Sequence, residues 1–369
     1  MVTGRAEQAV DLGVQQVAEQ LHDRLAQYLE ARYHIRDEGI INERRKLLEE
    51  PGSISQPPFI ETTPTYETDK PYKELGLPAP VGEVLSELAN WSPGIGVFPH
   101  PYVHQAQALR ALLVDGQDIV VATGTGSGKT ETFLFPILGQ FLLEAAHRPA
   151  TWQMPGCRAL LLYPMNALVS DQLARLRRLF GDERLADLFA NRYGRFPRFA
   201  MYTSRTPYPG PRTADKDRRY IEPVLRYYLD LERQAESGAS ERAHLVHELR
   251  ERGRWPAKNL RAFAANGYQT QPDDRELLTR HEIHACCPDI IVTNHSMLEY
   301  MLLRPIERSI FAQTRDWLAA DERNVLTLVL DEAHVYRGAS GAEVGLLMRR
   351  LAARLEVPRD RLRCILTSG

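Results

Sequence analysis

From residue 98 onward, short apolar runs alternate along the chain with longer segments of helical periodicity. The runs are rich in Val, Ile and Leu without polar alternation, which is typical of strands buried on both faces of a parallel sheet. Such strands are predicted at residues 118–122, 159–163, 199–202, 289–293, 326–330 and 362–367. Because helical patterns separate them, we expect an α/β, doubly wound parallel sheet with helices on both faces.

The segment before the sheet has a different pattern. Residues 6–50 are predicted to form one helix that stops at Pro51-Gly52, and its apolar face consists of Val10, Val14, Val17, Leu21, Leu25 and Tyr28. The proline-rich residues 51–80 predict an extended arm, followed by a short helix at 80–88. We therefore expect an N-terminal helical and proline-rich arm at residues 1–95 and the sheet domain at 96–369.

One stretch interrupts the sheet pattern. Residues 205–284 are charged and mostly helical, and they show no convincing strand. We expect a helical insertion at about residues 206–284. The apolar residues 133–143 are short and contain Pro136, so they predict a buried helix and not a membrane span.

Composition narrows the classes of protein further. The hydrophobic fraction of 43% supports a real core, and the net charge of −2 excludes a globally basic protein but permits a local basic track. Four scattered cysteines are too few for a disulfide framework, and the N-terminus lacks the apolar core of a signal peptide. A reducing cytoplasm is therefore the expected setting, with no membrane partner.

A phosphate-binding loop is predicted where the first strand runs into a helix. The loop has the sequence Thr-Gly-Thr-Gly-Ser-Gly-Lys-Thr at residues 123–130. Glycines let backbone N–H groups close around phosphate, and the helix N-terminus adds its dipole. Lys129 would contact the β- and γ-phosphates and Thr130 would place a hydroxyl on Mg²⁺. The residues expected to bind ATP here are Thr125, Gly126, Ser127, Gly128, Lys129 and Thr130. A glycine-rich loop without a ligand is the alternative.

A second motif follows the strand at 326–330, where Asp331-Glu332-Ala333-His334 begins at the strand's carboxyl end. Ligands of open parallel sheets bind at that edge. Asp331 would hold Mg²⁺ through water, and Glu332 would orient the attacking water. The alternative is a strand that ends in solvated acids.

These motifs, in this order, resemble those of superfamily 2 DEAD/DEAH-box helicases with a RecA-like fold. Helicases of this superfamily commonly lack the first glycine of the phosphate loop, where Thr123 stands. Gln105 resembles the glutamine that reads adenine. Further similar stretches are LLLYPMNALVSDQ, MYTSRTP, PDIIVTNHSMLEYML and the terminal ILTSG. The resemblance implies ATP and Mg²⁺ as cofactors, nucleic acid as partner and a catalytic set of Lys129, Asp331, Glu332 and His334.

The resemblance also implies which residues contact nucleic acid. These are Pro164, Asn166, Thr203, Ser204, Arg205, Thr293 and Asn294. Contacts of this kind grip the backbone and carry little sequence information. The alternative is that Thr203-Ser204 and Thr293-Asn294 only cap helices. Asn166 stands where many DEAD-box proteins have an arginine, so contact there would use hydrogen bonds and backbone groups.

A narrower resemblance covers most of the chain. The stretch DEAHVYRGASGAEVGLLMRRL and the N-terminal YLEARYHIRDEG are similar to very large bacterial helicases of phage-defence and DNA-repair systems. This implies DNA as the substrate. It also implies that residues 1–369 are the N-terminal portion of a motor, with a second RecA-like domain outside them.

Three other features have open interpretations. Arginines at 192–219, with interleaved aromatic residues, form either a nucleic-acid surface or a solvated face. His281, His284, Cys286 and Cys287 fit no strong zinc pattern. A ring of Phe98 or Tyr102 either stacks on adenine or belongs to the core.

We therefore interpret the chain as the ATP-binding half of an ATP-dependent helicase or translocase. A non-hydrolysing nucleic-acid-binding or regulatory module is the main alternative, and a metabolic P-loop kinase is a second.

Overall fold

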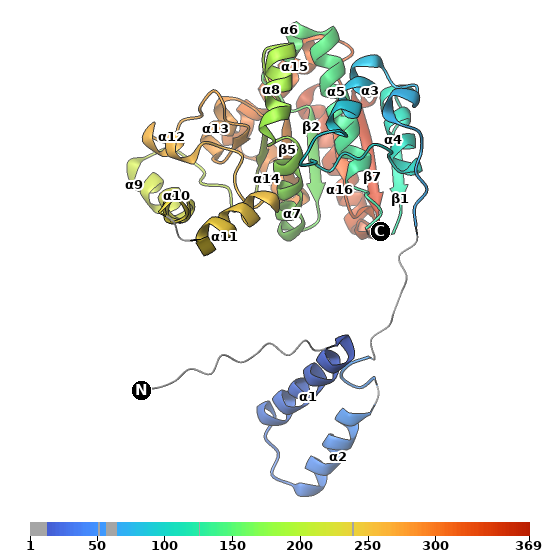
Figure 1. Cartoon of the computed structure of the whole chain (residues 1–369), viewed down its shortest axis with the longest axis vertical. Helices are drawn as coiled ribbons and strands as arrows, with labels where there is room; N and C mark the ends of the chain where they lie inside the picture. The colour runs from blue at the N-terminus through green and yellow to red at the C-terminus, as the bar shows by residue number, and fades with distance from the viewer. Residues whose placement is uncertain (1–12, 51, 57–64, 125, 238–239) are drawn as a thin grey trace. The chain divides into compact units, whose positions relative to one another are not determined.

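The computed structural model describes residues 13–50, 52–56, 65–124, 126–237 and 240–369. The chain forms two compact units, Met1–Thr65 and Tyr66–Gly369 (Figure 1). Within the described residues no helix is both long and apolar enough to cross a membrane. The four cysteines, all of them described, form no disulfide.

The first unit contains two helices where the sequence predicted one. They are α1 (Val14–Arg32) and α2 (Glu38–Glu49), and the part of the predicted helix before residue 13 lies outside the described residues. The chain turns because Asp37 caps α2, accepting a hydrogen bond from the Ile40 backbone N–H at 3.0 Å. Arg45 pairs with Glu30 across the two helices at 3.1 Å. The predicted apolar face of α1 is largely exposed, with Val14 at 77% and Leu21 at 62%.

The second unit is built on a seven-stranded, all-parallel sheet with the order β1-β7-β6-β2-β5-β3-β4. The strands are β1 (Ile119–Ala122), β2 (Ala159–Tyr163), β3 (Phe199–Met201), β4 (Glu276–Leu277), β5 (Ile290–Asn294), β6 (Leu326–Leu330) and β7 (Leu362–Ser368). Each of the six predicted strands is present with ends that differ by at most one residue. The predicted doubly wound parallel sheet is therefore confirmed.

The strand β4 corrects the prediction that residues 205–284 contain no strand. It is two residues long and pairs with β3 at the sheet edge, through Phe199 with Glu276 and Ala200 with Leu277. So short a strand leaves no periodicity to detect. Its position depends on Glu276, which is 1% exposed and pairs with Arg177 at 2.7 Å.

Two hydrophobic cores cover the two faces of the sheet, because successive strand residues point to opposite faces. Leu161 and Val292 belong to one core and Leu160 and Ile291 to the other. The helices of the first core are α3 (Ala79–Leu88), α4 (Val103–Leu113), α5 (Glu131–His147), α6 (Pro149–Trp152), α7 (Asn166–Leu179) and α8 (Glu183–Tyr193). Those that carry the second are α13 (Arg280–Ala285), α14 (His295–Leu303), α15 (Arg308–Ala320) and α16 (Gly338–Leu355).

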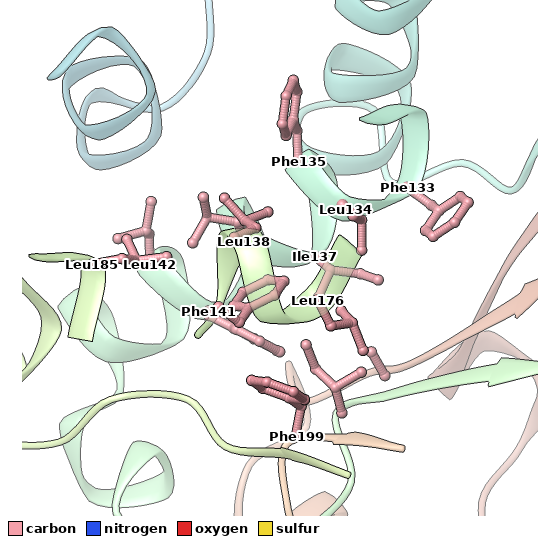
Figure 2. Close-up of a cluster of buried hydrophobic side chains, with 14 of the residues drawn as sticks. Phe133, Leu134, Phe135, Ile137, Leu138, Phe141, Leu142, Leu176, Leu185 and Phe199 are labelled. Atoms are coloured by element: carbon pink, nitrogen blue, oxygen red, sulfur yellow. The ribbon is translucent and has the colours of Figure 1, made fainter. Parts of the chain in front are cut away.

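The helix α5 is the centre of the first core. Figure 2 shows its side chains from Phe133 to Leu142 beside Leu176 of α7, Leu185 of α8 and Phe199 of β3. Because α3 also packs into this core through Val81 and Leu85, residues 66–95 of the predicted N-terminal arm belong to the sheet unit by packing.

The predicted insertion region contains α9 (Ala214–Tyr220), α10 (Glu222–Glu236), α11 (Ser240–Glu251) and α12 (Leu260–Ala265). In Figure 1 these helices gather on the side of the sheet away from β1 and α4. They enclose a third core that includes Trp255 and Phe263. Beneath it the fully buried Lys258 ammonium contacts Asp274 and, at 2.7 Å, Glu282.

Candidate nucleotide and nucleic-acid site

The predicted site residues follow the carboxyl ends of the strands, and the register places those ends side by side. Ala122 of β1 pairs with Ser368 of β7, and Tyr163 of β2 pairs with Asn294 of β5. The order of the sheet divides this edge into two halves. In one half, the phosphate loop follows β1, the acidic motif follows β6, and Thr367 and Ser368 end β7 between them. The predicted strand-contact residues lie after the ends of β2 and β3 and at the end of β5.

Backbone conformation shapes the phosphate loop. Gly126 and Gly128 have φ angles of 77° and 75°, which only glycine adopts without strain. A Cβ atom on Gly128 would collide with the Gln105 amide. The Ser127 hydroxyl is buried and lies 2.7 Å from that of Thr123, while α5 begins immediately after Thr130. The loop therefore presents backbone N–H groups at a helix N-terminus, with the half-buried Lys129 beside them. Thr125, which was also predicted to bind ATP, lies outside the described residues.

Gln105 is buried and bonded on both sides of its amide. Its Oε1 accepts from the Tyr102 backbone N–H at 3.0 Å, and its Nε2 donates to the Gly128 carbonyl at 3.1 Å. The neighbouring His104 Nε2 lies 2.9 Å from the Ser127 carbonyl oxygen. The start of α4 is thus tied to the phosphate loop, so a contact from Gln105 to adenine would be transmitted to the phosphates.

A cluster of three rings, Tyr66, Tyr102 and His104, lies at the start of α4. The sequence alone did not predict this cluster. Tyr66 lies 5.6 Å from Tyr102 and 5.5 Å from His104, between ring centroids. An isolated bridge between Thr68 and Tyr102 holds the segments together. Tyr66 sits in the irregular segment before η1 (Tyr72–Glu74), where no periodicity marks it. Phe98, the other ring considered for adenine, is 71% exposed.

Replacing Gln105 by Ala is expected to reduce the preference for ATP over GTP. An amide pairs with both the donor and the acceptor of the adenine edge. Two hydrogen bonds at about 0.5–1.5 kcal/mol each total about 1–3 kcal/mol, so the ratio of the two affinities should fall roughly fivefold to 150-fold. Competition binding with both nucleotides measures this ratio, and the exposed Gln107 on the same helix offers the control Gln107→Ala. An unaltered ratio in Gln105→Ala would remove the adenine assignment.

The acidic motif is fixed by its own backbone and by the end of β7. Asp331 Oδ1 accepts from the Glu332 backbone N–H at 2.9 Å and from the Thr367 hydroxyl. Glu332 has the left-handed φ of 53°, which turns the chain sharply after the strand. His334 Nδ1 lies 3.3 Å from Glu332 Oε2 and 3.1 Å from Ser368 Oγ. Three of the four predicted catalytic residues are therefore together with Thr367 and Ser368.

Two tyrosines surround this acid pair. Burial and the nearby Asp331 raise the pKa of Tyr163 well above its ordinary value. The same two causes raise the pKa of Tyr336 to about 12. Both phenols therefore stay neutral at physiological pH.

The predicted Mg²⁺ ligands fit that ion by their chemistry. Thr130 and Asp331 offer a hydroxyl and a carboxylate, which are the hard oxygen donors that Mg²⁺ prefers. Within the described ranges, no three His, Cys, Asp or Glu side chains form a metal-binding group.

The second half of the edge brings Asn166 and Asn294 into contact. Asn294 Nδ2 donates to Asn166 Oδ1 at 2.7 Å, although the residues are far apart in sequence. Asn294 also caps α14, accepting from the Met297 backbone N–H at 2.7 Å, so the capping alternative describes part of its role. Pro164 is half-buried just before Asn166.

The other predicted contacts differ in what they expose. The Thr203 and Thr293 side chains are completely buried, and the Thr293 hydroxyl donates to the Tyr202 carbonyl. Ser204 and Arg205 are exposed. Any contact at Thr203 or Thr293 would therefore use backbone groups, whereas Ser204 and Arg205 present side chains.

A buried arginine supports the loop that holds Thr203, and no sequence motif pointed to it. Arg280 at the start of α13 donates to the Thr203 carbonyl at 2.9 Å and to the Thr206 carbonyl at 3.2 Å. Its guanidinium lies 4.9 Å from the Tyr202 ring and 3.8 Å from the buried Glu307. Only the tertiary structure brings α13 to this loop.

The remaining sequence features have structural roles. Arg195 pairs with Asp289 at 2.7 Å and Arg212 with Asp217 at 3.0 Å, so much of the basic stretch is engaged internally. Burial lowers the pKa of His284 to about 4, which keeps this imidazole neutral. Its Nε2 lies 2.9 Å from the Tyr202 hydroxyl.

The chain is similar to proteins of a known helicase family. A family model described as DEAD/DEAH box helicase matches residues 102–195, from the helix that carries Gln105 through the phosphate loop and α7. The chain is 50% identical over 384 residues to the Druantia protein DruE of Escherichia coli (strain UMEA 4076-1), covering 97% of this chain and 20% of DruE. The chain carries a DEAD/DEAH box helicase domain.

Other relatives of this helicase domain are more distant. The chain is 24% identical over 268 residues to the uncharacterized ATP-dependent helicase MJ1574 of Methanocaldococcus jannaschii. This match covers 73% of the chain and 25% of that protein. A solved structure of the DUF1998 helicase MrfA bound to DNA and AMPPNP matches 83% of the chain and 28% of MrfA, with 20% identity and a TM-score of 0.44. The chain thus spans a quarter or less of the two curated relatives named here.

Proposed function

We propose that this chain is the ATP-binding half of a motor that hydrolyses ATP with Mg²⁺ and acts on DNA. The observation that carries this proposal is the division of one sheet edge. The loops that we expect to bind nucleotide and those that we expect to contact a strand lie at adjacent halves of this edge, which meet between the paired strands β6 and β2. A change at the phosphates therefore has a short path to the residues that would grip a strand.

The chain's own residues have distinct tasks in the proposed reaction. Lys129 places a positive charge at the β- and γ-phosphates, while Glu332 orients and polarises the attacking water. Thr130 and Asp331 would hold Mg²⁺, which neutralises phosphate charge when bound. His334 would connect the acid pair to the end of β7, because its Nδ1 lies near both Glu332 and Ser368.

DNA as the substrate rests on the resemblance to large bacterial helicases of phage-defence and DNA-repair systems. Binding to single-stranded DNA should be independent of sequence and should weaken as salt rises, because phosphate contacts release counterions. Replacing the exposed Arg205 by Ala should weaken binding to all sequences alike and reduce the salt slope by about 0.7. Fluorescence anisotropy over a range of salt concentrations measures both effects.

The control for that experiment is Arg323→Ala, which removes an exposed arginine paired with Asp321 at 2.7 Å, just before β6 at the opposite edge of the sheet. It should leave the slope unchanged. A flat salt response, or strong preference for one sequence, would contradict the proposed strand contact.

The rate of ATP hydrolysis distinguishes the proposed motor from the alternative, a non-hydrolysing nucleic-acid-binding module. We propose that residues 1–369 alone bind Mg-ATP but hydrolyse it slowly, because the resemblance assigns an arginine finger to a second RecA-like domain. Such a finger contributes about 10³–10⁵ in rate in other phosphoryl-transfer systems. A chain extended through that domain should hydrolyse ATP in a DNA-stimulated manner and lose this in Glu332→Gln. No hydrolysis by the extended chain would favour the alternative.

A further inference from the structure

Arg175 reaches the nucleotide site from the strand-contact half of the sheet edge. It lies on α7, the helix that begins at Asn166, and its Nη1 donates a hydrogen bond to Thr130 Oγ1. The same nitrogen lies 3.9 Å from Glu131 Oε1. Among the described residues, Arg175 supplies the one guanidinium hydrogen-bonded to residues 123–130. No motif of the sequence singled it out.

The Thr130 hydroxyl is the group that Mg²⁺ would require. A guanidinium keeps its charge at every physiological pH and only donates hydrogen bonds. It cannot remain on Thr130 Oγ1 while a divalent cation binds that oxygen, because two cations would then share one small, 5% exposed group. The arrangement therefore places a protein cation where the metal would bind.

Glu131 offers the position to which Arg175 can move. Its Oε2 is buried and has no hydrogen-bond partner among the described residues. That oxygen also faces the phosphate loop, since a Cβ atom built on Gly128 would lie 3.2 Å from it. An uncompensated carboxylate there would repel the phosphates, so Arg175 has a second effect, which is to neutralise Glu131.

We propose that Arg175 is a stand-in cation that controls how strongly nucleotide binding depends on Mg²⁺. Without metal it occupies Thr130 and offsets the charge of Glu131. When Mg²⁺ binds Thr130, the Arg175 guanidinium turns to Glu131. This inference rests on the proposed nucleotide site and adds a residue that regulates it.

The test compares the dissociation constants of a fluorescent ATP analogue in excess EDTA and in excess MgCl₂. In Arg175→Gln no guanidinium competes with Mg²⁺ for the Thr130 hydroxyl. The Glu131 carboxylate is then uncompensated and repels nucleotide that carries no metal. The ratio of the EDTA constant to the Mg²⁺ constant should therefore rise about threefold to tenfold, the net scale of one ordinary hydrogen bond. In Glu131→Gln the guanidinium loses the carboxylate to which it would turn, so it stays on Thr130, Mg²⁺ gains less and the ratio should fall.

Arg178→Gln is the matched control, because Arg178 is exposed on the same helix and should leave the ratio unchanged. Ligand-free thermal unfolding checks that each variant is folded. An unchanged or lower ratio in Arg175→Gln overturns the inference and leaves the nucleotide site standing. Equal weakening in both media would instead make Arg175 a direct phosphate ligand and also overturns it. Absence of nucleotide binding in the unmodified chain would overturn the proposed function and this inference together.

Discussion

Lys129→Ala is expected to abolish the stabilisation that Mg-ATP gives the protein. The Lys129 ammonium is half-buried in the phosphate loop, and without it the loop retains backbone N–H groups but no fixed charge for the β- and γ-phosphates. Ligand at about 100 times its dissociation constant adds about 2.7 kcal/mol to stability. At roughly 2 °C for each kcal/mol, this is a rise of about 5 °C in Tm.

Thermal unfolding with and without Mg-ATP measures this rise, and the variant should show almost none of it. Lys73→Ala serves as the control, because Lys73 is exposed in η1 and removes the same charge elsewhere in the second unit. The ligand-free Tm of Lys129→Ala should match that of the unmodified protein. If Lys129→Ala kept the full Mg-ATP shift, the phosphate loop would not be the nucleotide site.

The sequence could predict the parts of this site that local chemistry determines. The phosphate loop is a strand, a glycine-rich turn and a helix in direct succession, and its glycines need the positive φ angles that the structure shows at Gly126 and Gly128. The acidic motif follows a strand whose five residues are all buried. A run of apolar residues followed by Asp331-Glu332 is visible without any tertiary information.

Contacts between distant segments could not be predicted in this way. Arg175 reaches Thr130 only because α7 packs against the sheet near the phosphate loop, and Tyr66 reaches Tyr102 only through the bridge at Thr68. The strand β4 depends on pairing with β3 and carries no pattern of its own. The N-terminal segment was predicted as one helix because no proline stands between Tyr28, where its apolar spacing ends, and Pro51. The turn before α2 is marked only by the cap at Asp37.

The pair of Asn166 and Asn294 lies between these cases. Each residue follows a predicted strand, and parallel strands bring their carboxyl ends to one edge. Their direct contact at 2.7 Å requires β2 and β5 to be neighbours, which the order along the chain does not specify. Sequence thus placed both residues on the correct edge, and the sheet order made them partners.

The sheet also depends on a buried charge network that has no catalytic task. Arg158 is 3% exposed and pairs with Glu144 at 2.8 Å and with Asp289 at 2.9 Å, whose side chains are 4% and 3% exposed. Its guanidinium lies 4.7 Å from the Trp317 ring, and Trp317 Nε1 donates to Glu144 at 2.8 Å. The network joins α5 and α15 to the segments that lead into β2 and β5.

Arg158→Met is expected to cost about 3–5 kcal/mol of folding stability. It removes the guanidinium that pairs with both of the buried carboxylates, Glu144 and Asp289. At roughly 2 °C for each kcal/mol, Tm should fall by about 6–10 °C. Arg192→Met is the matched control. Arg192 pairs with Glu87 at 2.6 Å, but both side chains are more than 40% exposed, so the loss should stay below about 1 kcal/mol.

The pH dependence of Arg158→Met tests the cause of the loss. Burial alone would raise the pKa of Asp289, but Arg195 and Arg158 outweigh it and hold that pKa below the ordinary 3.8. A lowered carboxylate pKa stabilises the fold above the ordinary value, and this stabilisation is lost as pH falls through the folded pKa. The difference between Arg158→Met and the unmodified protein should therefore be full near neutral pH and shrink below about pH 4, as denaturant unfolding at each pH would show. A difference as small as that of Arg192→Met, or one that grows as the pH falls, would mean that the ion pairs do not hold this corner of the sheet.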